Sequence, residues 1–271
     1  MRVVVNADDF GLSNETVDAT IECFERGALT SATIMPNAPA TDRALAFALS
    51  HPEFSFGVHL TLVGDGDDRP ISPPEEVPGL VGAGGVLPAT NLVRLRALLR
   101  RLDARQLDRE ISAQIAVVRD AGVPVSHVDS HRHMHKFGPV LASLARVLPS
   151  FGITRVRNVQ DVYVGTPLLS PTYWLGRLWR RKLMSHFTTT NHFFMSAGSP
   201  EGGWERPLVG RIRRLTGPTL EIGVHPGSME PWREAERRSV FACVAALREG
   251  GHVLVDWRAI DGDALHAGQL K

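Results

Sequence analysis

The chain has 271 residues, of which 43% are hydrophobic and 22% are charged, and its formal net charge is +1. This composition is typical of a folded globular protein and excludes a disordered chain, while the balanced charge gives no argument for nucleic acid as a partner. The sequence contains no window of about 20 apolar residues that could span a membrane, and the start of the chain does not have the pattern of a signal peptide. We therefore expect a cytoplasmic protein.

Strand-like and helix-like segments alternate along the chain. Strands are expected at residues 2–7, 30–37, 54–62, 125–131, 153–159, 219–227 and 252–257. Helices are expected at residues 15–27, 41–51, 92–101, 107–121, 138–152 and 234–251, and a long Gly-, Pro- and Asp-rich loop at 63–88. Repeated β-α alternation predicts a parallel sheet with helices outside it, and hence an α/β barrel or a doubly wound sheet.

Local signals mark two of these helices. Ser13 is expected to cap the first helix, and Gly27 to end it. The helix at 107–121 has apolar residues at the spacing of one buried face, namely Leu107, Ile111, Ile115 and Val118.

The alternating pattern breaks down between Pro167 and Pro207, where aromatic residues are frequent and periodicity is weak. We expect a helical or irregular insert there, within a single domain that covers residues 1–271. No linker, internal repeat or glycine fingerprint for nucleotide phosphates divides the chain. Cys23 and Cys243 lie in helical segments and are expected to be buried rather than disulfide-bonded.

Charged and ligand-type residues collect at the carboxyl ends of the predicted strands. They are Asp8 and Asp9, His59, the run from His127 to His135, Arg155 with Arg157, and His225. In α/β barrels the carboxyl ends of the strands converge on one face, where functional sites form. Each residue alone has an ordinary explanation, such as a core histidine or a turn. The joint pattern favours a site.

Oxygen and imidazole ligands in this arrangement suit a divalent cation. An open catalytic metal site typically has about three protein ligands together with water. One Asp and two His from three strand ends supply such a set. Two adjacent carboxylates repel each other at a strand end unless a cation or a proton-transfer role offsets the cost. We therefore expect one of Asp8 and Asp9 to bind the metal and the other to accept a proton.

Four motifs occur in order between Asn6 and Trp257, namely "NADDFG", "GVHLTL", "HVDSHRHMH" and "EIGVHPG". Together they resemble the YdjC/ChbG-like carbohydrate deacetylases, a family that includes hopanoid-biosynthesis-associated deacetylases. The resemblance implies an irregular (β/α) barrel related to NodB-type polysaccharide deacetylases. It also implies a metal-dependent hydrolase of linear amides that removes the acetyl group from an N-acetylated amino sugar, either an oligosaccharide or a lipid-linked sugar.

The resemblance assigns roles to single residues. One divalent cation, Mg²⁺ or Zn²⁺, would be held by Asp9, His59 and His131. Asp8 matches the general base, and His225 matches the proposed general acid. Arg157 lies where relatives often carry a basic residue near the substrate.

Two other classes of protein remain open. One is a metal-dependent phosphoesterase or amidohydrolase that acts on another substrate, for which a second metal at His127, His133 or His135 would argue. The other is a non-catalytic protein that binds a sugar or a metal. The Asp8–Asp9 pair and His225 favour an enzyme, because pure binding requires neither a spare base nor a spare acid.

The segment "PTYWLGRLWRRKLMSHF" predicts a basic amphipathic helix. Its Trp174 and Trp179 could stack on sugar faces as substrate-binding residues. The stretch Tyr173–Phe187 could be scaffold, a lid that meets an acidic substrate group, or a peripheral contact with an anionic membrane. The sequence leaves these three roles open, and also leaves open whether the protein forms a homodimer.

Overall fold

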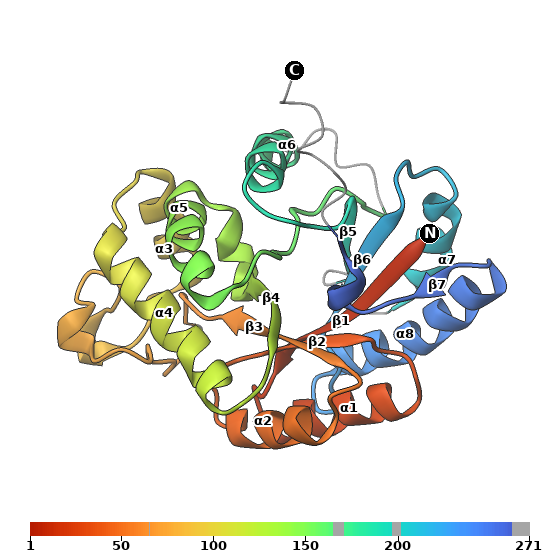
Figure 1. The fold of residues 1–271 in the computed structure, drawn as a ribbon, viewed down its shortest axis with the longest axis horizontal. Coiled ribbons are helices and arrows are strands. Elements are labelled where there is room, and N and C mark those ends of the chain that lie inside the picture. The colour runs from red at the N-terminus through yellow and green to blue at the C-terminus, as the bar shows by residue number, and fades with distance from the viewer. Residues whose placement is uncertain (65, 165–170, 197–201, 262–271) are drawn as a thin grey trace.

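A single parallel sheet organises the chain in the computed structural model, which describes residues 1–64, 66–164, 171–196 and 202–261 (Figure 1). The sheet order is β4-β3-β2-β1-β6-β5. The strands are β1 (Arg2–Phe10), β2 (Ser31–Ile34), β3 (Ser55–Leu60), β4 (Val125–Ser130), β5 (His192–Met195) and β6 (Thr219–Val224), and the short β7 (Val253–Leu254) pairs with the start of β1.

The two edges of this sheet are joined by isolated bridges. Val156 pairs with Val128 of β4, and Val162 pairs with Phe194 of β5. The chain from 156 to 162 therefore passes from one edge strand to the other, so the sheet curls into an irregular barrel. This confirms the expected barrel, but the strand expected at 153–159 is wrong. That segment crosses the gap between the edges instead of running along a partner, so it forms single bridges only.

Helices pack on the outside of the curled sheet (Figure 1). They are α1 (Asn14–Glu25), α2 (Thr41–Ser50), α3 (Thr90–Leu98), α4 (Ala104–Asp120), α5 (Gly138–Val147), α6 (Pro171–Met184), α7 (Glu205–Ile212) and α8 (Pro231–Glu249). Short 3₁₀ turns are η1 (Pro74–Glu76), η2 (Ala83–Gly85), η3 (His131–Lys136), η4 (Leu148–Phe151) and η6 (Trp257–Ala259). Ser13 caps α1 through a reciprocal pair of hydrogen bonds with Thr16, as expected of a helix start. The four apolar residues that predicted the buried face of α4 are all buried.

The two faces of the sheet differ in polarity. In β1, Val3, Val5 and Ala7 join the apolar core between sheet and helices. The alternate residues point into the barrel, where Val4 packs on Trp257 and Asn6 bonds Asp8. Because side chains alternate along a strand, the apolar core lies outside the barrel and its interior can hold polar groups.

The region expected to be an insert contributes to the sheet. Between residues 167 and 207 the chain forms α6, β5 and the start of α7, and β5 pairs in parallel with β6. Residues 165–170 and 197–201 of this region lie outside the described part of the chain. The "HFFM" run of β5 is too short for its period to be seen, which is why the sequence showed no strand here. The single domain over 1–271 stays a prediction.

The two cysteines are both buried and free, as expected. Burial raises the pKa of the Cys23 and Cys243 thiols to about 12, so neither forms a thiolate at neutral pH. Among the described residues, no helix has the length and apolar character needed to cross a membrane.

Candidate metal centre

A distortion at the end of β1 separates the two adjacent carboxylates. In a regular strand, neighbouring side chains point to opposite faces. Here the register between β1 and β2 shifts between Ala7 and Phe10, and Asp9 has a positive φ of 57°. This left-handed conformation costs about 1–2 kcal/mol for a residue other than glycine. It leaves Asp8 in the barrel interior and places Asp9 within reach of two histidines from other strands.

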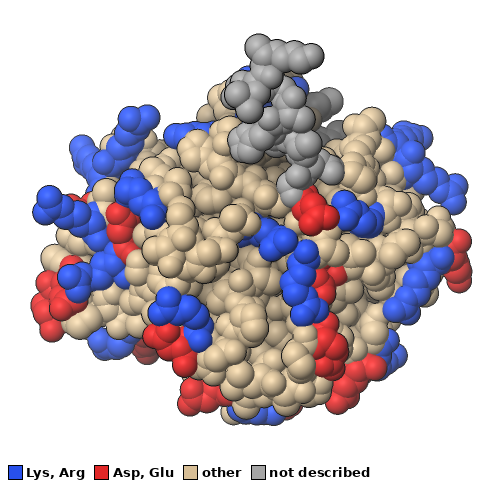
Figure 2. All heavy atoms as spheres, viewed as in Figure 1, with Lys and Arg blue, Asp and Glu red and all other residues tan. Residues whose placement is uncertain are grey.

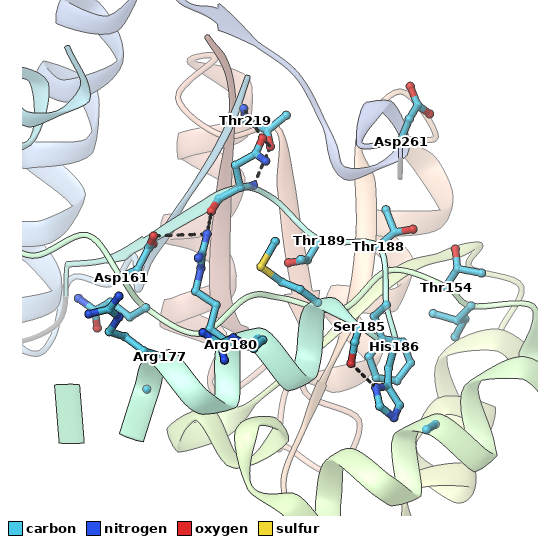
Figure 3. A pocket seen from close by; sticks show the side chains of 18 of the residues that line it. Thr154, Asp161, Arg177, Arg180, Ser185, His186, Thr188, Thr189, Thr219 and Asp261 are labelled. Atoms are coloured by element: carbon cyan, nitrogen blue, oxygen red, sulfur yellow. Dashed lines mark hydrogen bonds and ion pairs between the residues drawn. The ribbon is translucent and has the colours of Figure 1, made fainter. Parts of the chain in front are cut away.

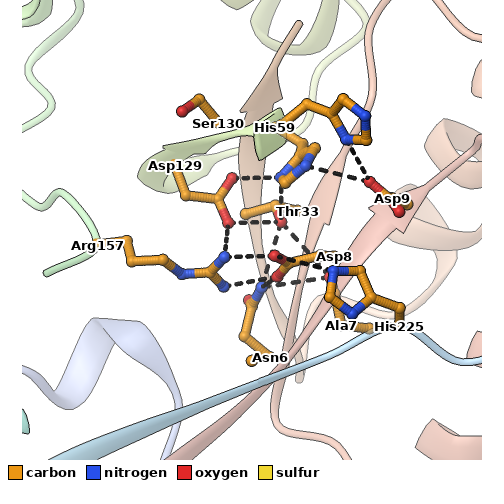
Figure 4. A network of polar contacts seen from close by, with 12 residues as sticks. Asn6, Ala7, Asp8, Asp9, Thr33, His59, Asp129, Ser130, Arg157 and His225 are labelled. Atoms are coloured by element: carbon orange, nitrogen blue, oxygen red, sulfur yellow. Dashed lines mark hydrogen bonds and ion pairs between the residues drawn. The ribbon is translucent and has the colours of Figure 1, made fainter. Parts of the chain in front are cut away.

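Asp9, His59 and His131 form a group of three ligand-type side chains. Figure 4 labels Asp9 and His59 of this group. One oxygen of Asp9, Oδ1, is 3.2 Å from Nε2 of His59 and 3.0 Å from Nδ1 of His131. The three ligand atoms all lie within 4.8 Å of one another. Nε2 of His59 is buried, and despite its closeness to Asp9 it makes no hydrogen bond of good geometry. A carboxylate oxygen and two imidazole nitrogens are suitable ligands for a divalent cation, and a cation would satisfy the orphaned nitrogen.

Asp129 of β4 orients His59 from the other side of its ring. Its Oδ1 is 2.7 Å from Nδ1 of His59, so Nδ1 carries the proton and Nε2 faces Asp9. Burial lowers the pKa of His59, but Asp129 and Asp9 outweigh it and raise that pKa to about 10. Asp129 lies within the run from His127 to His135 that the sequence places at a strand end, but no pattern in the sequence indicates this orienting role.

A second group of possible ligands is formed by Asp8, His59 and Asp129, but the positively charged guanidinium of Arg157 already contacts both of its carboxylates. Nη1 of Arg157 is 2.5 Å from Asp8 and 2.6 Å from Asp129. Because the guanidinium neutralises these carboxylates, this group does not suit a second metal. His127, His133 and His135 do not form a second metal site either, because no further group of three possible ligands occurs among the described residues.

Arg157 is fully buried, and each of its three guanidinium nitrogens contacts a carboxylate. Nε is 2.8 Å and Nη2 is 2.7 Å from Glu221 of β6, and Nη2 is also 2.6 Å from Asp8. Nη1 makes the remaining two contacts, with Asp8 and Asp129. These contacts make Arg157 a positioning residue for Asp8, and the contact with substrate expected from the sequence stays a prediction. Burial raises the pKa of Asp8, but Arg157 and the nearby imidazoles lower it to about 2.

Replacing Arg157 by Met is expected to lower the free energy of unfolding by about 3–5 kcal/mol, because it leaves buried carboxylates without their partner. Urea unfolding at pH 7 measures this change. Arg155→Met is the control, since the partly exposed Arg155 donates only to the backbone oxygens of Arg258 and Ile260. Equal losses in the two variants would contradict the role given to Arg157.

His225 lies directly after β6 and faces Asp8 across the mouth of the barrel. Its Nε2 is 3.9 Å from Oδ2 of Asp8. Glu236 of α8 holds the other side of the residue, because Oε2 is 3.2 Å from Nδ1 and accepts the backbone N–H of His225 at 3.0 Å. Burial lowers the pKa of His225, but Glu236, Asp9 and Asp8 raise it above its ordinary value of 6.5.

Helix α8 supports both sides of the site through two residues that the sequence analysis missed. Arg233 donates from Nη2 to Oδ2 of Asp9 at 2.8 Å, and Glu236 holds His225. Both are buried on the same face of α8 as Val240 and Leu247. The signal was present in the sequence, because charged residues three apart continue the apolar face of this helix.

The remaining candidates lie elsewhere. His127 stacks on Trp257 with ring centroids 4.5 Å apart, and Nδ1 of His135 bonds the hydroxyl of Ser130. Trp179 packs on Phe137. The side chain of Trp174 is exposed. Stacking of the two tryptophans on a sugar stays a prediction.

The inner side of α6 lines a groove of about 1830 Å³ (Figure 3). Arg180 crosses this groove, with Nη2 bonded to the backbone oxygen of Asn191 and 3.6 Å from Asp161. The residues that line the groove do not include Asp9, His59 or His131, which we call the metal-ligand group. The groove is therefore separate from the candidate metal centre.

The curled parallel sheet, with an Asp–His–His group at the carboxyl ends of its strands, defines an α/β-barrel protein with a candidate metal centre. The model of the YdjC-like protein family matches residues 2–266, and the chain belongs to this family. The resemblance seen in the four motifs is thereby confirmed.

Curated relatives and a solved structure agree with this assignment. A carbohydrate deacetylase of Oceanobacillus iheyensis is 32% identical over 233 residues, which are 85% of this chain and 87% of that protein. A carbohydrate deacetylase of Geobacillus stearothermophilus is 37% identical over 145 residues, so that alignment spans 52% of this chain and 55% of the relative. A crystal structure from Enterococcus faecalis V583 has a TM-score of 0.78 at 23% identity, covers 94% of this chain and 97% of that one, and shows the same fold.

Proposed function

We propose that this protein is a metal-dependent carbohydrate deacetylase that removes the acetyl group from an N-acetylated amino sugar. The observation that carries the proposal is the Asp9–His59–His131 group, with Asp8 and His225 facing each other beside it. The names of the curated relatives support the reaction and the class of substrate. The cytoplasmic location expected from the sequence stays a prediction.

The residues around the group suit hydrolysis of an amide. One divalent cation, Mg²⁺ or Zn²⁺, would be held by Asp9, His59 and His131, and would supply Lewis-acid polarisation of the acetyl carbonyl. Asp8 is ionised at neutral pH and would accept the proton of the attacking water at Oδ2. His225, protonated at Nε2, would donate a proton to the leaving nitrogen.

Acetate release tests this function directly. The purified protein is incubated with N-acetylglucosamine, its β-1,4-linked oligomers and a lipid-linked N-acetyl sugar, each with Mg²⁺, Zn²⁺ or EDTA. We expect acetate release that EDTA abolishes and that one of the two metals restores. Hydrolysis of a phosphate ester or an unrelated amide, without acetate from any of these sugars, would instead support the other metal hydrolases. Metal binding without any hydrolysis would support a binding protein.

The role of Glu236 gives a prediction about pH. A raised pKa keeps His225 protonated to higher pH, so kcat/KM should fall only as the pH rises through that raised value. Glu236→Gln removes the carboxylate charge, and the fall is expected to begin about one pH unit lower. The pH profile of kcat/KM measures the shift. Glu234→Gln is the control, because Glu234 pairs with the exposed Arg238. An unchanged profile in Glu236→Gln would contradict the assignment.

A further inference from the structure

Large apolar side chains are exposed mainly on two helices. Of the eleven that are exposed among the described residues, seven lie on or directly after α3 and α6. Those of α3 are Leu92, Leu95, Leu98 and the following Leu99, between 44% and 56% exposed. Those of α6 are Trp174, Leu175 and Leu178, between 40% and 60% exposed. We call these two exposed faces the basic apolar surface. Exposed apolar side chains gathered on a helix face commonly mark interaction sites.

Positive charge accompanies these apolar residues. The exposed cations are Arg100 and Arg101 after α3, and Arg177, Arg181 and Lys182 of α6. No Asp or Glu occurs between residues 77 and 102 or between 162 and 200. These two stretches hold eight of the 30 Lys and Arg residues and none of the 29 acids, so they are net positive although the whole chain has a net charge of only +1. In the view of Figure 2, Lys and Arg lie along the upper left edge, where Figure 1 shows α3.

The two helices lie on either side of η3, the turn that begins with His131. On one side, Arg94 of α3 donates to the backbone oxygen of Arg132 at 2.9 Å. On the other side, Trp179 of α6 packs on Phe137, and Nζ of Lys136 lies 5.5 Å from the ring of Trp179. Figure 1 shows α3, α5 and α6 together in the upper part of the molecule. The basic apolar surface therefore borders the turn that carries one of the proposed metal ligands.

We propose that the basic apolar surface binds the surface of an anionic lipid bilayer. Leucine and tryptophan side chains on a basic helix enter the headgroup region, while Lys and Arg contact anionic lipids. A second copy of this chain fits the surface less well, because a symmetric contact would oppose two acid-free basic faces. The docked protein would present the η3 side of the barrel mouth to the membrane.

Vesicle sedimentation tests this proposal. The full chain is incubated with phosphatidylcholine vesicles that contain either no or 30 mol% phosphatidylglycerol, a composition chosen for the assay, at low and high salt. We expect sedimentation with the anionic vesicles only, weakened by salt. Each cation near the surface contributes about fivefold to the partition coefficient. Arg177→Ser/Arg181→Ser/Lys182→Ser is therefore expected to lower it by about a hundredfold.

The apolar part is tested on both helices with matched controls. Leu95→Ser and Leu178→Ser are each expected to lower the partition coefficient by about tenfold, as for partial loss of leucine burial. Leu49→Ser, at an exposed leucine of α2, and Arg213→Ser/Arg214→Ser, after α7, are expected to leave it unchanged. Circular dichroism and melting temperature show that each variant is folded.

Three outcomes would overturn the proposal. The first is the absence of sedimentation with anionic vesicles. The second is binding that the control substitutions weaken as much as those in α3 and α6. The third is that light scattering shows a dimer, that Leu95→Ser or Leu178→Ser dissociates this dimer, and that vesicle binding is unchanged. That result would make the surface an interface between copies of the chain. None of these results depends on the proposed deacetylase activity.

Discussion

Replacing Asp8 by Asn is expected to lower kcat for acetate release by about 10²–10⁴-fold, the usual contribution of a general base. The amide has the shape of the carboxylate and can still accept one of the two Arg157 hydrogen bonds at its single oxygen, but it cannot take a proton from water. Asp8 is outside the Asp9–His59–His131 group, so the metal content of the variant should equal that of the wild type. Single-turnover kinetics and elemental analysis of the same preparation measure both quantities.

Glu221→Gln is the matched control for this prediction. Glu221 also contacts Arg157 and is fully buried, but it is not paired with His225 or with the metal-ligand group. Burial raises the pKa of Glu221 to about 7 despite the opposing effect of Arg157. If Glu221→Gln lowered kcat as much as Asp8→Asn, the loss would come from the charge around Arg157 and not from proton transfer. Near-normal kcat in Asp8→Asn would remove Asp8 from the mechanism.

Replacing His59 by Ala is expected to remove metal and activity together. His59 supplies one of three ligand atoms, and the loss of one from a three-residue set leaves too few to hold a cation against dialysis. Elemental analysis after dialysis, followed by an acetate-release assay with added metal, separates loss of affinity from loss of chemistry. Full metal occupancy in His59→Ala would show that the ligand assignment is wrong.

His127→Ala is the control for the loss of a buried histidine. His127 lies in the neighbouring strand β4 and is fully buried, but it stacks on Trp257 instead of facing the metal-ligand group. Its removal should lower stability through the cavity it leaves, without lowering metal content. Equal metal loss in both variants would point to a general collapse of the barrel.

The sequence predicted the parts of the site that lie at the ends of regular strands. His59 lies near the end of β3 and His225 directly follows β6, two strands whose apolar pattern is clear, so their place at one end of a parallel sheet could be inferred. The distortion that separates Asp8 from Asp9 could not, because a positive φ at a non-glycine residue depends on tertiary contacts. The sequence therefore indicated that the two acids would differ, without the geometry that makes them differ.

Residues that act through distant partners were harder to predict. Arg157 was expected near the substrate because relatives in the family it resembles often carry a basic residue there. Its burial among Asp8, Asp129 and Glu221 joins four separate segments, and no local pattern encodes such a contact. Arg233 and Glu236 resembled ordinary surface charges of an amphipathic helix, although their spacing placed them on its buried face.

The position of His59 between Asp129 and Asp9 would make metal binding at the proposed centre compete with protons. The pKa of about 10 that these carboxylates give the imidazole means that the metal-free protein carries a proton there at neutral pH. A cation can bind Nε2 only after that proton leaves, so metal uptake is also acid release. Affinity for the cation should therefore weaken as the pH falls. An acidic buffer would remove the metal without any chelator. Protein purified in such a buffer would be inactive although it is correctly folded.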